Sequence, residues 1–180
     1  MKKILLPTDF SNNSWNAITY ALQLFKDEIC TFYLLNTYTP GEYVLVNPAQ
    51  FGLADAVRET SIKNVNEIYE KIQKGFKNPN HQFEQISVFN TLLSEVKEQV
   101  NKKPIDLIVM GTKGATGAKE VLFGSNTVHV LNQVKCPVLA IPDDFNYENP
   151  HELLFPTDYE IKFESKHLNL ILELAKKQTA

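Results

Sequence analysis

The sequence predicts an α/β protein with a doubly wound parallel sheet, and three observations lead to that fold class. Short apolar segments that suit buried strands alternate along the chain with amphipathic segments that suit helices. The apolar segments are continuous, which is typical of strands covered on both faces. Strands that alternate with helices are joined by right-handed crossovers, so helices cover both faces of the sheet. We therefore expect five parallel strands.

The first two strands and the helix between them are expected in the first 38 residues. Lys2 to Leu6 is apolar enough for a buried strand, and a Pro-Thr-Asp turn follows it. Asp9 or Ser11 can cap the next helix, which we expect from Asn13 to Lys26. Strand two is expected from Thr31 to Tyr38, because aromatic residues there favour a strand.

The middle of the chain continues the alternation. Residues 39–52 are expected to form a loop that either covers a ligand or packs against a partner chain. A long amphipathic helix is expected over 53–76, a strand over 83–89 and a helix over 90–102. Strand five is expected over 135–141.

The segment DLIVMGTKGATGAKEVLFGS, residues 106–125, has the features of an anion site. An apolar strand leads into a glycine-containing loop, and Ser125 lies at or near the N-cap of a helix expected over 126–134. Glycine lets a backbone approach a phosphate closely, and the first N–H groups of a helix attract anions. Glycines after a strand also serve as plain turn residues, and the spacing matches neither common phosphate loop.

The glycines at 111, 114 and 124, followed by Ser125, have the spacing G-x2-G-x9-G-[S/T]. This pattern resembles the ATP-binding motif of the universal stress protein family. Lys3 to Ser11 resembles the first strand and turn of that family, and residues 130–142 resemble its closing helix and last strand. The resemblance covers residues 1 to about 142. It implies an adenine nucleotide alpha hydrolase-like sheet in the strand order 3-2-1-4-5.

The resemblance also implies the ligand and the residues that bind it. The matched positions are Pro7, Thr8 and Asp9 in the turn that contacts adenosine; Met110, Gly111 and Gly114 near the ribose and phosphates; and Gly124, Ser125, Asn126 and Thr127 at the phosphate-binding helix start. Many members have an aliphatic residue at position 126, so the role of this side chain stays open. Backbone groups near Thr37 can face the base. The expected ligand is ATP, AMP or ADP, and whether Mg²⁺ accompanies it stays open.

These residues lead to three hypotheses about function. The first is a cytoplasmic universal stress protein that binds ATP or another adenine nucleotide and acts as a stress-response regulator. The second is a slow ATPase or an adenylating enzyme, and the third is a dimeric interaction module with an empty pocket. We expect no catalytic residues and no metal ligands, because the sequence shows no nucleophile with a base, no paired carboxylates and no metal cluster. A homodimer is expected through the sheet edge at Val138–Ile141.

Charge, apolar runs and cysteine content argue against several classes of function. The net charge of −3 gives no reason to expect nucleic-acid binding. No apolar run approaches the ~20 residues of a membrane helix, and we expect no export signal. Cys30 and Cys136 are expected to be small buried residues in a reducing cytosol rather than metal ligands.

The last part of the chain repeats the first. Glu152 to Tyr159 (ELLFPTDY) follows the pattern of Lys3 to Phe10 (KILLPTDF), with the same Pro-Thr-Asp turn. We therefore expect residues 1–142 to form one domain, 143–150 a linker, and 151–180 the start of a second, incomplete domain. That start comprises a strand at Leu153 to Phe155 and a helix. It has no glycine loop, so Asp158 should have no nucleotide of its own.

Overall fold

The computed structural model describes residues 1–39, 51–112, 123–143, 145–156, 160 and 165–178. The chain divides into two compact units, Met1–Asn146 and Tyr147–Ala180. The predicted loop of residues 39–52 lies mostly outside the described residues, as does most of the segment between Thr112 and Gly124.

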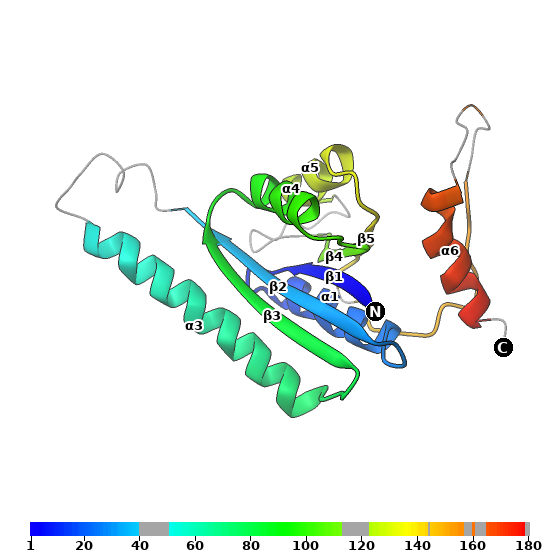
Figure 1. The fold of residues 1–180 in the computed structure, drawn as a ribbon, viewed down its shortest axis with the longest axis horizontal. Helices are drawn as coiled ribbons and strands as arrows, with labels where there is room; N and C mark the ends of the chain where they lie inside the picture. The colour runs from blue at the N-terminus through cyan, green and yellow to red at the C-terminus, as the bar shows by residue number, and fades with distance from the viewer. Residues whose placement is uncertain (40–50, 113–122, 144, 157–159, 161–164, 179–180) are drawn as a thin grey trace. The chain divides into compact units, whose positions relative to one another are not determined.

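The first unit is built on a five-stranded parallel sheet, and the expected strand order β3-β2-β1-β4-β5 is confirmed (Figure 1). The strands are β1 (Lys2–Pro7), β2 (Cys30–Tyr38), β3 (His81–Phe89), β4 (Leu107–Gly111) and β5 (Val138–Ile141). β1 lies at the centre and pairs with both β2 and β4. β3 and β5 are therefore the two edges of the sheet.

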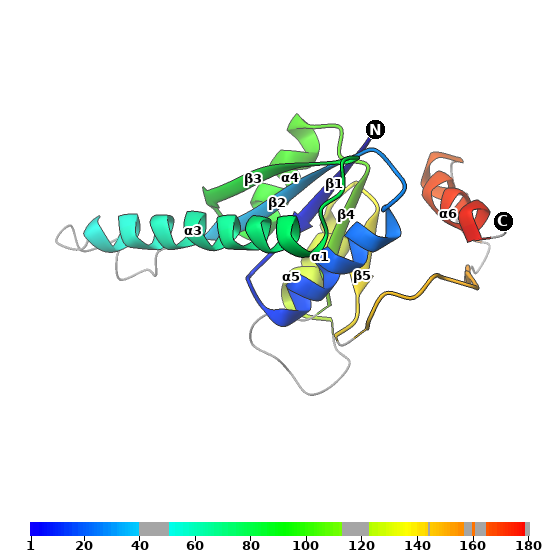
Figure 2. The ribbon, with the colours of Figure 1, turned by 90° about the horizontal axis from the view of Figure 1, so that it is seen from below.

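Helices cover both faces of this sheet (Figure 2). They are α1 (Asn12–Leu24), α3 (Phe51–Gly75), α4 (Leu92–Lys102) and α5 (Ser125–Gln133). α1 and α3 pack on one face, and α4 and α5 pack on the other. The helices that follow β1 and β4 thus lie on opposite faces, and the two strands diverge at their carboxyl ends.

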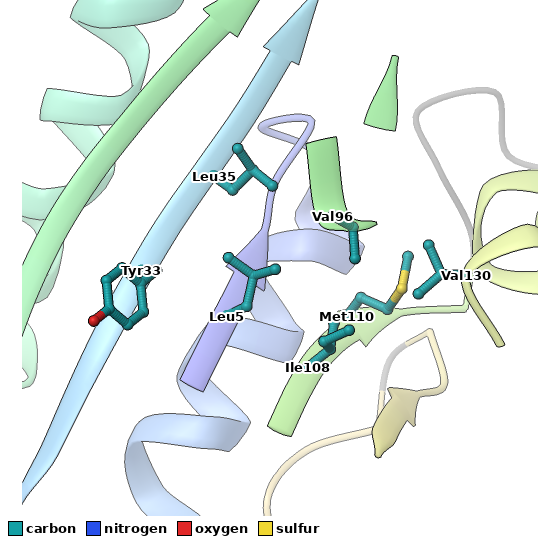
Figure 3. Packing of buried hydrophobic residues seen from close by; sticks show 7 residues of the cluster. All are labelled: Leu5, Tyr33, Leu35, Val96, Ile108, Met110 and Val130. Atoms are coloured by element: carbon teal, nitrogen blue, oxygen red, sulfur yellow. The ribbon is translucent and has the colours of Figure 1, made fainter. Parts of the chain in front are cut away.

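The core lies on both sides of the central strands, because successive strand residues point to opposite faces. On the α4 and α5 side, a cluster of buried side chains fills the space between the sheet and the helices (Figure 3). Its members are Leu5, Tyr33, Leu35, Val96, Ile108, Met110 and Val130. On the other side, Phe32 stacks on Phe83, whose ring meets that of Tyr69 on α3. This two-sided burial explains why the strands are apolar without interruption.

Two boundaries differ from the sequence prediction. α3 begins at Phe51 and not at residue 53, so the expected loop is shorter. β5 begins at Val138 and not at residue 135. Pro137 precedes it, and a proline has no N–H with which to extend the ladder. The carbonyl of Pro137 still accepts a hydrogen bond from the Ile108 backbone N–H at 2.9 Å.

The second unit contains α6 (Ser165–Gln178), which agrees with the helix expected after the repeated turn. The strand predicted at Leu153 to Phe155 is wrong for this structure, since residues 151–156 have no regular secondary structure. Leu154 is 91% exposed. A strand is stabilised in part by burial of one face, and residues 151–156 are all exposed. The assignment of 151–180 to a second domain stays a prediction.

Candidate functional site

A pocket of about 190 Å³ opens at the carboxyl ends of β1, β2 and β4. This is the crevice where β1 and β4 diverge, which is where open parallel sheets bind ligands. It is lined by Pro7, Thr8, Asp9, Ser14, Asn36, Thr37, Leu92, Met110, Gly111, Gly124, Ser125, Asn126 and Thr127. The lining includes every residue predicted for the site except Gly114, which lies outside the described residues.

Three lining residues were missed by the sequence reasoning: Ser14, Asn36 and Leu92. Asn36 had a signal that could have found it, because it is a polar residue at the end of an apolar strand. Ser14 follows the N-cap Ser11 by three residues, which is the position whose N–H an N-cap side chain binds. Leu92 is the first residue of α4, and an aliphatic residue there carries no distinctive signal.

In the turn between β1 and α1, the side chain of Ser11 caps the helix and the side chain of Asp9 lines the pocket. Ser11 is the N-cap of α1 and accepts a hydrogen bond from the Ser14 N–H at 3.2 Å. Asp9 in turn accepts from the Ser11 N–H at 3.1 Å and from the Ser11 hydroxyl at 2.5 Å. Phe10, between them, has a φ of 65°, which is unusual for a large side chain. Asp9 is thus exposed at the pocket. Its hydrogen bonds with Ser11 hold the turn that carries it.

Thr8 is held inside this turn. Its hydroxyl accepts from the Phe10 N–H at 3.0 Å and lies 3.0 Å from the Ser14 hydroxyl. The Ser14 hydroxyl donates to the Ser11 carbonyl at 2.9 Å, so the proton between Thr8 and Ser14 comes from Thr8. Since Thr8 is only 6% exposed and its proton is engaged, its side chain shapes the turn.

Gly111 ends β4 directly beneath α1. A Cβ at this position would lie 2.0 Å from Asn13 Oδ1 and 3.1 Å from the Asn13 carbonyl oxygen. Helix packing alone therefore requires glycine here. The Gly111 carbonyl accepts a hydrogen bond from the Thr127 hydroxyl at 2.9 Å, and Thr127 is 2% exposed. This bond ties the start of α5 to the end of β4, and it engages the hydroxyl of a residue that the family resemblance places at the phosphate-binding helix start.

The N-terminus of α5 opens into the pocket. Gly124 is the N-cap and Ser125 the first helical residue, so Ser125 lies next to the N-cap as expected, and the helix begins one residue before the predicted start at 126. Within the described part of the chain, no side chain caps this helix. The Gly124 N–H donates to the Thr112 carbonyl at 2.5 Å, which fixes where the helix starts. The first-turn N–H groups of a helix have no intrahelical partner, and here they lie beside a pocket, as in an anion site.

Among the described residues that line the pocket, Asp9 is the single ionisable side chain. Among the residues that the structure describes, no group of three or more His, Cys, Asp or Glu side chains could hold a metal ion. No described helix is both long enough and apolar enough to span a bilayer. The described lining of the pocket therefore offers backbone N–H groups, small hydroxyls and one carboxylate, which suits a ligand with an anionic end and a polar end.

Both cysteines are free thiols outside the pocket. Burial raises the pKa of Cys30 and of Cys136 to about 11. Each thiol is therefore protonated at neutral pH, when it is a poor nucleophile and a poor metal ligand. This agrees with their expected role as packing residues.

The sequence matches the model of the universal stress protein family over residues 1–142. Universal stress protein MJ0531 of Methanocaldococcus jannaschii is 30% identical over 140 residues, which is 78% of this chain and 81% of that protein. Universal stress protein MJ0577 of the same organism is 26% identical over 155 residues, or 78% of this chain and 94% of that protein.

Solved structures show the same likeness. The structure of MJ0577 matches with a TM-score of 0.69 and 25% identity over 81% of this chain and 98% of that one. A protein of this family from Arabidopsis thaliana, solved with AMP bound, matches with a TM-score of 0.55 and 11% identity over 80% of this chain and 93% of that one. The latter likeness shows a shared fold.

Proposed function

The chain belongs to the universal stress protein family, and from that membership we propose that its pocket binds an adenine nucleotide, with ATP as the preferred form. The protein would act as a cytoplasmic regulator in a stress response, changing its contacts with partners according to the bound nucleotide. The observation that carries the proposal is the N-terminus of α5, which opens without a described side-chain cap beside the β1–α1 turn.

The phosphates are proposed to lie against the first turn of α5. Ser125 and Asn126 line the pocket there, and both are exposed. Their backbone N–H groups and the Ser125 hydroxyl can donate to phosphate oxygens, and the helix dipole favours the negative charge. Thr127 contributes its backbone position, because its hydroxyl is bonded to Gly111. The helix end thus supplies positive potential where the described lining side chains carry no positive charge.

The nucleoside is proposed to lie toward β1 and β2. Asp9 is exposed at this end and can accept hydrogen bonds from ribose hydroxyls or from the base. Backbone groups near Thr37, at the carboxyl end of β2, face the same pocket. The AMP-bound plant relative supports an adenine nucleotide as the ligand class. The preference for ATP follows from the resemblance of the glycine spacing to the motif of ATP-binding members.

The proposal assigns no Mg²⁺ ligand to the protein among the described residues. Asp9 is the one lining carboxylate, and one of its oxygens already accepts two hydrogen bonds from Ser11. An ion that accompanies ATP would be held by the phosphates and water, as Mg²⁺ often is. We also propose binding without rapid turnover, because the described residues that line the pocket include no lysine or arginine to stabilise a transferring phosphoryl group.

The partner is proposed to be a second copy of this chain, paired through β5. β5 is an edge of the sheet, and Val138 to Ala140 are half-buried, so their apolar surface is only partly covered. Bare apolar edges invite pairing. Sedimentation equilibrium should show a dimer, and Leu139→Lys should shift it to monomer; a wild type that stays monomeric at high concentration would refute this contact.

Calorimetric titration tests the nucleotide site. We expect the wild type to bind ATP more tightly than AMP, and to bind GTP weakly, in parallel runs with and without Mg²⁺. Gly124→Val places a branched side chain at the helix start and should weaken ATP binding by at least about tenfold. Gly75→Val is the matched control, because a Cβ at Gly75 meets nothing within 4 Å.

A wrong function and a wrongly placed site would give different results in these titrations. If the wild type binds no adenine nucleotide, the proposed function is wrong. If the wild type binds ATP and folded Gly124→Val binds it equally well, the nucleotide lies elsewhere. Thermal unfolding of both glycine variants reports whether each is folded. Hydrolysis followed over many hours distinguishes a binding protein from a slow ATPase.

A further inference from the structure

Asn36 lies at the carboxyl end of β2, between the pocket and α3. Its side chain is 7% exposed, and both of its polar atoms are engaged. The Nδ2 atom donates to the Thr8 carbonyl at 2.7 Å. The Oδ1 atom accepts from the hydroxyl of Ser61, a residue of α3, at 2.6 Å. Ser61 is 4% exposed, and its oxygen also lies 2.6 Å from the hydroxyl of Ser87 on β3.

The direction of each hydrogen bond can be deduced from the donors available. The Thr8 carbonyl only accepts, so the amide nitrogen of Asn36 must face it and the amide oxygen must face Ser61. That oxygen also only accepts, so the single proton of Ser61 goes to Asn36. Ser87 must then donate to Ser61. The result is a one-way chain of hydrogen bonds, from Ser87 through Ser61 and Asn36 to the Thr8 carbonyl.

This chain ends on the turn that carries Asp9. The Thr8 N–H donates to the Leu35 carbonyl at 2.8 Å, so β2 binds Thr8 through both its backbone and the Asn36 side chain. A buried polar group costs free energy unless it is bonded, and three apolar side chains would fill the same space without that risk. What the polar chain adds is geometry, because it fixes the peptide plane between Thr8 and Asp9.

We propose that Asn36 is a positioning residue for the nucleotide site and that Ser61 and Ser87 hold it, so that α3 and β3 set the position of Asp9. The proposal rests on the proposed function.

Ser61→Ala breaks the chain at a residue that does not line the pocket, so no lining residue is itself substituted. Thr60→Ala is the matched control. Thr60 is the neighbouring residue on α3 and also loses a hydroxyl, but that hydroxyl bonds only within α3, to the Ala56 carbonyl at 2.7 Å. Ser87→Ala removes only the far bond of the chain, and its effect should be smaller than that of Ser61→Ala.

The first measurement needs no nucleotide. A triple-resonance spectrum that links the Asp9 N–H to the Thr8 carbonyl carbon reports the hydrogen bond accepted by that carbonyl. Ser61→Ala should move the Thr8 carbonyl signal upfield, as expected when the Asn36 amide is no longer held in place, and Thr60→Ala should leave it unchanged. An unchanged signal in folded Ser61→Ala would overturn the proposal.

The second measurement is calorimetric titration with ATP. We expect Ser61→Ala to weaken ATP binding by about five- to tenfold, which is the typical effect of losing one hydrogen bond. Ser87→Ala should weaken it by about twofold relative to the wild type. Thr60→Ala should bind ATP as tightly as the wild type. Wild-type affinity in Ser61→Ala, or equal loss in Ser61→Ala and Thr60→Ala, would overturn the positioning role alone. A wild type without ATP binding would overturn the proposed function, and the positioning role with it.

Discussion

The same sequence pattern occurs twice in this chain and has two different structures. Leu5-Leu6-Pro7 ends the central strand of the sheet, and Leu5 and Leu6 are completely buried. Leu154-Phe155-Pro156 lies in a segment with no regular secondary structure. There Leu154 is 91% exposed and Phe155 is 45% exposed. The two copies differ little in β-propensity, so local preference does not explain the difference.

The difference lies in the neighbours of each copy. β1 pairs with β2 along its whole length and with β4 at Ile4 and Leu5, and helices cover both of its faces. The second unit, Tyr147–Ala180, has one described helix, α6, and no described strand. Strand formation is stabilised by cross-strand hydrogen bonds and burial, and most of both come from residues far away in the sequence. The pattern makes a strand possible, and the neighbours decide whether it forms.

The sharpest probe of this comparison is thiol reactivity. Burial raises the pKa of Cys30, on β2 beside β1, to about 11. At pH 8 only about one thiol in a thousand is then ionised, against about a quarter for an exposed cysteine, so a thiolate-dependent reagent should label a Leu154→Cys variant at least about two hundredfold faster than Cys30.

The pH dependence gives the control for that labelling. The rate at Cys30 should keep rising with pH until the pKa of about 11, whereas the rate at Leu154→Cys should level off above about pH 9. Mass spectrometry of labelled peptides separates the two sites from Cys136. Slow labelling at position 154 would mean that the second copy is covered in solution.

Truncation of the paired leucines should give the next largest effect. Leu5→Ala removes a completely buried side chain and should lower the free energy of unfolding by about 2–5 kcal/mol. Leu154→Ala removes an exposed one and should change it by less than about 0.5 kcal/mol. Urea unfolding measures both changes, provided that the dependence of the unfolding free energy on urea concentration is the same as in the wild type. Comparable losses would show that the two copies are packed alike.

The paired aspartates compare the two copies as ligand sites. Asp9→Asn keeps the shape of the side chain and removes its charge, and it should weaken ATP binding by about tenfold through loss of charge-assisted hydrogen bonds. Asp158→Asn should leave ATP binding unchanged, because residues 151–180 contain no glycine with which to form such a site. Calorimetric titration of both variants measures this. A loss in Asp158→Asn would assign part of the site to the second copy.

The smallest effect is expected from removing the second copy altogether. A chain ending at Asn146 keeps the Phe145 carbonyl, which accepts from Asn16 at 3.0 Å, and the Phe145 ring near Tyr20. Its ATP affinity should stay within about twofold of the wild type. A chain ending at Pro142 should bind ATP equally well, while its stability falls by about 1 kcal/mol. Loss of ATP binding in the chain ending at Asn146 would mean that the tail completes the first site.

The candidate site shows which of its features could be predicted from the sequence. The Pro-Thr-Asp turn and the glycine motif located the pocket, because turns and helix starts have local sequence signals. The roles of individual side chains could not be predicted from these patterns. The hydroxyl of Thr127 bonds to Gly111, and the hydroxyl of Thr8 bonds to Ser14 on α1 and to the Phe10 N–H. Gly111 is required by the close approach of Asn13, which a motif for phosphate binding does not reveal.

The sequence by itself determined the fold class, because alternating apolar strands and amphipathic helices are local, periodic features that need no knowledge of partners. The strand order came from the family resemblance. Only the tertiary structure decided which copy of the repeated pattern became a strand. It alone placed Asn36 between Thr8 and Ser61, which are 28 and 25 residues away along the chain. Such bonds depend on how elements pack, and a polar residue looks the same in the sequence whatever lies opposite it in the fold.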